Sequence, residues 1–106
     1  MAWVYLFLAG VTEVAWAIGL KQTDGWTRPW PSVITAMLMV VSFVLLSLAI
    51  RALPIGTAYA VWTGIGAVGT AIAGIIFFGE PRTAVRLGCI ALILIGIVGL
   101  KASSPQ

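Results

Sequence analysis

The sequence predicts an all-α membrane protein with four transmembrane helices, and its composition is the main reason. Hydrophobic residues make up 61% of the 106 residues, whereas charged residues make up only 8%. The mean hydropathy is +1.13. Typical globular domains carry roughly 25% charged residues, so this chain has too few charges to cover a water-exposed surface. The twelve glycines and five tryptophans fit the same class, because glycine is common in membrane helices and tryptophan at membrane interfaces.

Charged residues divide the chain into four apolar stretches within a single domain, residues 1–106. The first stretch is interrupted only by Glu13, and the second and third lie on either side of Arg51. A spanning helix needs about 20 apolar residues, and the fourth stretch, between Arg86 and Lys101, is shorter than that. It still spans if both basic side chains extend toward the interface. We therefore predict four helices, at about 2–21, 30–50, 55–78 and 84–101.

The segments between the predicted helices have the composition of tight turns. Residues 22–25, 53–56 and 79–81 each contain glycine, and two of these segments contain proline, which are the residues that most often end regular structure. Trp26 and Trp30 follow the first segment, where amphipathic rings would lie at the membrane interface. The connections are too short to form a separate soluble domain.

Several functional classes are excluded by residues that the chain lacks. It has no histidine and one cysteine, Cys89, so that the commonest metal ligand and proton shuttle are missing. We expect no metal site, no cofactor and no enzymatic activity. The net charge of +3 is too thinly spread for a nucleic-acid interface. Residues 64–69 match the G-x-G-x-x-G pattern, but they lie within a membrane-length apolar stretch, whereas a dinucleotide site requires a strand–turn–helix unit.

Basic residues are distributed almost evenly between the two predicted faces of the membrane. One face carries Arg51, Lys101 and the N-terminal amine, and the other carries Lys21, Arg28, Arg82 and Arg86. Because lysine and arginine in short loops determine orientation, this weak bias predicts a chain that can insert in both orientations.

Glu13 is the most informative residue, because it is an acid near the middle of a predicted span. An ionised acid there costs about 2.5–3.5 kcal/mol on the insertion scale, and no lysine, arginine or histidine lies within a span to neutralise it. One interpretation is a protonated acid that hydrogen-bonds between helices for packing. The other is functional: a desolvated carboxyl group that exchanges a proton for a cation.

Aromatic and small residues at helical spacing surround this acid. Gly10 and Trp16 lie one turn from Glu13 on the same helix face, together with Ala9 and Ala17. On the third helix, one face carries Tyr59, Trp62, Thr63 and Gly66, and the second helix contributes Ser42 near its middle. Each aromatic could instead serve in packing or in an interfacial belt, and Ser42 could bond its own helix. Together, aromatic faces, N–H and O–H donors and a carboxylate are typical of a cation site.

With these residues in place, the sequence resembles the small multidrug resistance family of four-helix bacterial transporters along essentially its whole length. The matching segments are residues 12–21, 30–32, 42–43 and 53–66. Within that family it resembles the guanidinium exporters more than the quaternary-ammonium branch. The residues that favour the exporters are Trp16, where the multidrug branch has a small residue, and Met39, where that branch often has tyrosine.

The resemblance implies an antiparallel, dual-topology homodimer in the bacterial cytoplasmic (inner) membrane that exports guanidinium in exchange for protons. It implies that Glu13 binds both substrate and proton, that Trp16 and Ser42 orient its carboxylate, and that Tyr59 and Trp62 line the site; helical spacing adds Gly10 and Thr63 to this lining. It also places a helix hinge at Gly64 and Gly66, and dimer packing on the fourth helix at Leu92, Ile93, Gly96 and Ile97.

Two other functions remain open from the sequence. The first is a multidrug antiporter of the same family that exchanges quaternary ammonium cations for protons. The second is a subunit of a lipid-carrier flippase of related four-helix design, which should lack the group formed by Glu13, Trp16, Tyr59 and Trp62. The expected partners are the transported guanidinium ions and protons, the lipid bilayer and a second copy of the chain, and we expect no nucleic acid.

Overall fold

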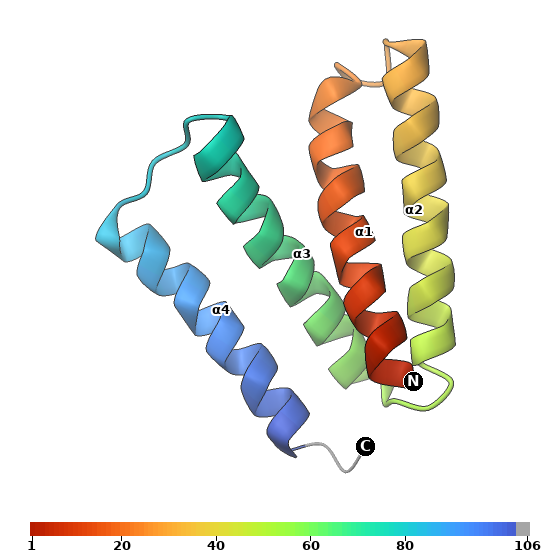
Figure 1. Ribbon diagram of the computed structural model, residues 1–106, viewed down its shortest axis with the longest axis vertical. Helices are drawn as coiled ribbons and strands as arrows, with labels where there is room; N and C mark the ends of the chain where they lie inside the picture. The colour runs from red at the N-terminus through yellow and green to blue at the C-terminus, as the bar shows by residue number, and fades with distance from the viewer. Residues whose placement is uncertain (104–106) are drawn as a thin grey trace.

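The computed structural model describes residues 1–103, and the last three residues of the predicted domain lie outside this range. Four helices make up the fold (Figure 1): α1 (Ala2–Gln22), α2 (Pro29–Ala49), α3 (Ile55–Phe77) and α4 (Ala84–Ser103). Each is long and apolar enough to cross a membrane, so the predicted all-helical class with four candidate spans is confirmed. The helix ends lie within two residues of the predicted ones.

The helix ends follow from local sequence. Pro29 is the first residue of α2, after Arg28 in an extended conformation; proline suits this position because its missing N–H would have no helical acceptor. At the end of α3, Gly79 adopts a positive φ of 65°, and the N–H groups of Phe78 and Glu80 both donate to the carbonyl oxygen of Gly74. This left-handed glycine turns the chain toward α4.

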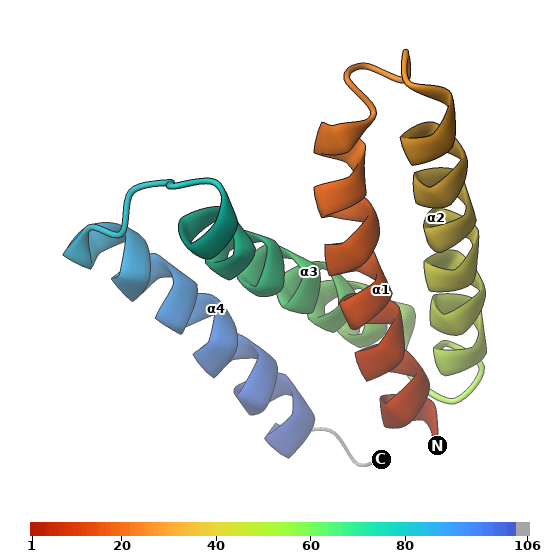
Figure 2. The same ribbon diagram turned by 45° about the horizontal axis from the view of Figure 1, so that its top comes forward.

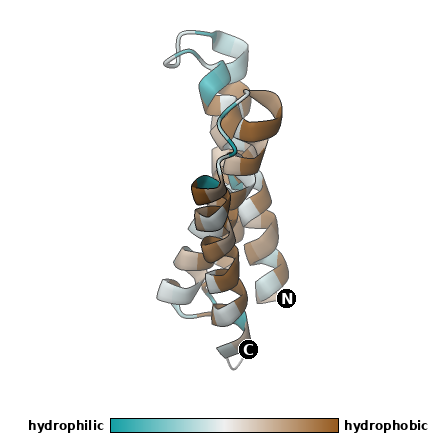
Figure 3. Ribbon diagram, turned by 90° about the vertical axis from the view of Figure 1, so that its left-hand side faces the viewer, coloured by the Kyte–Doolittle hydropathy of each residue, from teal (hydrophilic) through white to brown (hydrophobic). Residues whose placement is uncertain are grey.

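The helices form a thin, open arrangement. In Figures 1 and 2, α1 packs against α2 on one side, the start of α3 passes behind α1, and α4 lies beside α3 with its C-terminal end near the start of α1. The Cα atoms extend over 43 × 35 × 16 Å, so the molecule is less than half as thick as it is wide. Hydrophobic residues run along the helices, and the most hydrophilic ones lie at their ends (Figure 3). Large apolar side chains are nevertheless exposed on all four helices in a single chain.

The buried core lies where the start of α1, the end of α2 and the start of α3 meet. It consists of seven apolar residues: Leu6, Ala9, Ala49, Leu53, Ala58, Val61 and Trp62. Farther along, α1 and α3 approach closely because glycines face branched side chains: Gly10 faces Ile65, and Gly69 faces Val14. By contrast, α4 has no buried residue.

Candidate functional site

Glu13 lies at the contact between α1 and α3. Its carboxyl group rests against Gly66, so closely that a Cβ atom added there would collide with it. Its Oε1 atom is buried and has no hydrogen-bond partner among residues 1–103. The one ion pair within the described chain joins Glu80 to Arg86, and Glu13 has no basic partner there. The glycine at position 66 is therefore what makes room for the acid.

A row of four aromatic rings runs across the helices beside this carboxyl group. The ring centroids of Trp16 and Phe43 are 6.4 Å apart, those of Phe43 and Trp62 are 5.8 Å apart, and those of Trp62 and Tyr59 are 5.5 Å apart. Trp62 is 6% exposed, whereas Tyr59 at the end of the row is 56% exposed. The row thus leads from α1 through α2 to an accessible ring on α3.

Phe43 is the one member of this row that was not predicted from the sequence as a site residue. It connects the rings of Trp16 and Trp62, which are contributed by different helices. The sequence did contain a signal for Phe43, because it is an aromatic residue next to Ser42 in the middle of an uncharged span. Spacing within one helix could not show that it lies between rings of two others.

Ser42 is fully buried and joins three helices. Its hydroxyl donates to the carbonyl oxygen of Ala9 on α1 at 2.8 Å and accepts from Trp62 Nε1 on α3 at 3.0 Å. A hydroxyl group has a single hydrogen to donate, so this arrangement leaves none for Glu13. The indole nitrogen of Trp16 is buried without a partner among residues 1–103. Neither of the two expected hydrogen bonds to the carboxylate is therefore formed within one chain.

The remaining predicted site residues occupy different environments. Gly10 is buried beneath Ile65, whereas Thr63 is exposed on α3. Gly64 faces α4, where a Cβ atom would meet Ile97 at 2.9 Å and Ile93 at 3.5 Å. The helix α3 continues through Gly64 and Gly66 without a break.

On α4, the four residues expected in dimer packing divide into two pairs. Ile93 and Ile97 face Gly64 of the same chain. Leu92 is 68% exposed, and the position of a Cβ atom at Gly96 has no neighbour within 4 Å. Leu92 and Gly96 are therefore the pair left uncovered within one chain.

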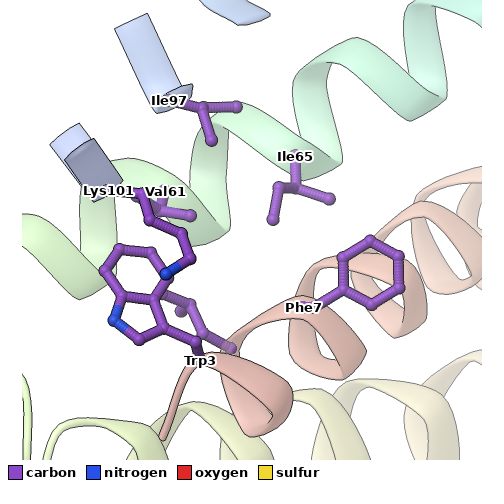
Figure 4. Close-up of a pocket in the computed structure, with 7 residues that line it drawn as sticks. Trp3, Phe7, Val61, Ile65, Ile97 and Lys101 are labelled. Atoms are coloured by element: carbon purple, nitrogen blue, oxygen red, sulfur yellow. The ribbon is translucent and has the colours of Figure 1, made fainter. Parts of the chain in front are cut away.

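A cavity of about 200 Å³ lies near the start of α1, away from Glu13. Figure 4 shows Trp3 and Phe7 of α1, Ile65 of α3 and Lys101 of α4 around it. The Lys101 ammonium nitrogen is 4.7 Å from the centroid of the Trp3 ring, a cation–π distance. This contact links the end of α4 to the start of α1. Apart from Lys101, the cavity walls are apolar.

The comparisons with known proteins place this geometry in a family. Residues 1–99 match the family model described as Small Multidrug Resistance protein. The chain belongs to the small multidrug resistance family. It is 57% identical over 104 residues to a guanidinium exporter of Escherichia coli (strain K12), an alignment that covers 98% of this chain and 99% of the relative. It is 58% identical to guanidinium exporters of Proteus vulgaris and Citrobacter freundii, covering 98% of this chain and 100% and 99% of theirs.

Family membership and four helices able to span a membrane make the chain a multi-pass membrane protein. The resemblance inferred from the sequence is thus confirmed, including its closeness to the guanidinium exporters. The relatives are named for transport and not for a chemical reaction. No group of three or more potential metal ligands occurs among residues 1–103.

Proposed function

We propose that this protein exports guanidinium across the bacterial inner membrane in exchange for protons, and that Glu13 binds both. The observation that carries the proposal is the buried carboxyl oxygen of Glu13, which has no partner within the described chain and lies beside a row of aromatic rings. The names of relatives at 57–58% identity support guanidinium as the substrate.

Exchange follows from the isolation of this carboxyl group. An ionised acid without a basic partner is costly in a membrane, so binding either a proton or a cation stabilises it, and one carboxylate cannot hold both. Guanidinium suits such a site because it is planar, permanently charged and able to direct two parallel N–H donors at one carboxylate. Aromatic faces such as Tyr59 add cation–π attraction, about 2 kcal/mol when desolvated.

The proposal includes an antiparallel homodimer with a shared central site. Three properties support it: large apolar side chains exposed on all four helices, buried polar atoms of Glu13 and Trp16 that lack partners among residues 1–103, and a weak charge bias between the two membrane faces. A second copy in the opposite orientation would cover some of these apolar side chains and supply the inverted repeat that transporters commonly contain. On α4, Leu92 and Gly96 are available for this packing, and Ile93 and Ile97, which contact Gly64 of the same chain, lie next to them on the helix.

Within this site, we assign Trp16 as the donor to the carboxylate, because its indole N–H is buried, has no partner among residues 1–103 and lies one helical turn from Glu13. Ser42 acts on the site through Trp62, the residue whose N–H it accepts. Tyr59 and Thr63 are the exposed members of the lining, and Gly10 allows the close approach of α1 and α3. A hinge at Gly64 and Gly66 would let the site open to alternate sides.

Transport in proteoliposomes tests the proposal. With a proton gradient imposed across the membrane, the purified protein should transport guanidinium in the direction opposite to proton flow. It should transport a bulky polyaromatic cation such as ethidium poorly. Glu13→Gln should abolish guanidinium transport and guanidinium-induced proton release. The matched control is Glu80→Gln, the same change at an exposed carboxylate paired with Arg86, which should retain both.

The outcomes separate the alternatives. Retained proton-coupled uptake in Glu13→Gln would refute the central role of this carboxylate. Ethidium uptake equal to guanidinium uptake would replace the proposal with a multidrug antiporter. The absence of proton release on adding guanidinium, with normal insertion and dimerisation, would favour a non-transporting subunit such as a flippase component.

A further inference from the structure

The loop between α1 and α2 is built around one buried hydroxyl group. Thr23 is fully buried; its side chain donates to the carbonyl oxygen of Leu20 at 2.7 Å and accepts the N–H of Trp26 at 3.2 Å. Its own carbonyl oxygen accepts the N–H groups of Thr27 and Arg28 at 3.0 and 3.1 Å. Thr23 thus ends α1 and determines where the loop presents the residues that follow.

Two residues of this loop adopt a strained backbone. Asp24 has φ 50° and Trp26 has φ 69°, the left-handed region that is rare for residues other than glycine and unusual for a bulky side chain. Strain of this kind persists where surrounding contacts enforce it and often marks functional positions. Here it holds the half-exposed Trp26 indole at the end of α1, near Trp30, which is 77% exposed.

Beside the loop, the ends of α1 and α2 border an open cavity of about 320 Å³. Its walls are formed by Gly19, Gln22, Arg28, Pro31, Ile34 and Thr35. The Arg28 guanidinium donates one N–H to the carbonyl oxygen of Gln22 at 3.2 Å. Arginine has five N–H donors, and the others have no partner among residues 1–103. Asp24, the acidic residue of the loop, does not line this cavity.

Thr35 lies beneath the cavity, with its hydroxyl group packed against Gly19. The Thr35 side chain is fully buried, and its hydroxyl oxygen has no hydrogen-bond partner among the residues described. It faces Gly19, where an added Cβ atom would lie 2.5 Å from that oxygen. Gly19 thus makes room for the Thr35 hydroxyl group between the two helices, and the exposed polar residues that line the cavity are Arg28 and Gln22.

From these features we infer that the cavity beside the α1–α2 loop binds the phosphate group of an anionic phospholipid. Arginine recognises phosphate through parallel N–H donors, and the cavity lies at a helix end, where the lipid headgroups are in a chain that spans the membrane. Trp26 and Trp30 on the same loop are typical of residues at headgroup depth. This position favours a lipid phosphate over free phosphate from solution.

Lipid binding by the purified protein tests this inference. Detergent-solubilised protein would be titrated with phosphatidylglycerol, and bound lipid counted by native mass spectrometry; phosphatidylcholine with the same acyl chains and inorganic phosphate serve as the other two ligands. Arg28→Gln should weaken phosphatidylglycerol binding about fivefold. Arg28→Lys, which keeps the charge and loses the planar group, should fall between that variant and the unchanged protein.

The matched control is Arg82→Gln, which removes the same charge at the same end of the bundle but outside the cavity. It should leave binding unchanged. Equal loss in Arg82→Gln would mean that overall charge governs binding, and unchanged binding in Arg28→Gln would mean that the cavity is not the site. Either result, or inorganic phosphate binding as tightly as the lipid, would overturn the inference.

Discussion

The two glycines of the proposed hinge, Gly64 and Gly66, contact different side chains. Replacing each of them by alanine should therefore change guanidinium binding by different amounts. In Gly66→Ala, the new Cβ atom would lie 2.8 Å from Glu13 Cγ and closer still to the carboxyl group. Carbon atoms at optimal separation are about 3.5–4.0 Å apart, so Cγ must move by roughly 0.7 Å and the carboxyl group by more. In Gly64→Ala, the nearest atom is Ile97 Cδ1 at 2.9 Å, the end of a flexible side chain.

The substitution at Gly66 should therefore weaken guanidinium binding far more than the one at Gly64. A hydrogen bond to a charged group is worth about 1.5–3 kcal/mol, and misplacing the carboxylate forfeits much of it, so we expect an affinity at least about tenfold lower. For Gly64→Ala we expect a change of about twofold or less. The larger effect at Gly66 comes from displacement of the Glu13 side chain and not from the loss of backbone flexibility.

The measurement is a titration of guanidinium-induced proton release from detergent-solubilised protein, which reports binding without requiring transport. Gly88→Ala on α4 is a control for adding a methyl group to a glycine helix position, because a Cβ atom there has no neighbour within 4 Å. Equal loss of affinity in the Gly64 and Gly66 variants would refute the reasoning, since it would show that both glycines act through helix flexibility.

Two further predictions concern the carboxylate and the end of α4. Guanidinium affinity should fall as the pH is lowered, because protons and substrate compete for Glu13; a pH-independent affinity, measured by equilibrium binding, would contradict one shared group. Lys101→Gln should lower the stability of the folded protein by about 0.5–1 kcal/mol through loss of the cation–π contact with Trp3, which is 4.7 Å long. Denaturation in mixed micelles measures this, and no change in stability would show that the contact contributes nothing.

The sequence predicts the four helices well because charge and apolar length determine them. Each of the four apolar stretches forms one helix, and Pro29 and Gly79 lie where the chain enters and leaves one. The importance of Glu13 can also be predicted from the sequence, because an ionised acid in an apolar span has a high free energy wherever its neighbours lie. These properties are local, and helix periodicity is sufficient to interpret them.

Contacts between helices were harder to predict, because spacing along one helix does not fix its rotation against another. Gly66 and Glu13 are 53 positions apart in sequence, and no pattern indicates that the glycine accommodates the acid. The same limit applies to Phe43 between two tryptophan rings and to Ser42, whose hydroxyl is directed at Ala9. A bond from Ser42 to Glu13 is reasonable from residue type, but a buried hydroxyl takes the nearest available acceptor.

The bond that Ser42 makes gives it a different role from a direct ligand of the carboxylate. Ala9, whose carbonyl oxygen accepts from Ser42, lies one turn before Glu13 on α1, and Trp62, which donates to Ser42, lies one turn before Gly66 on α3. The two hydrogen bonds therefore join α1, α2 and α3 one turn away from the contact between Glu13 and Gly66. If a bound cation displaced Trp62, these two hydrogen bonds would transmit the displacement through Ser42 to α1, and the proposed aromatic lining would thereby affect the position of the carboxylate.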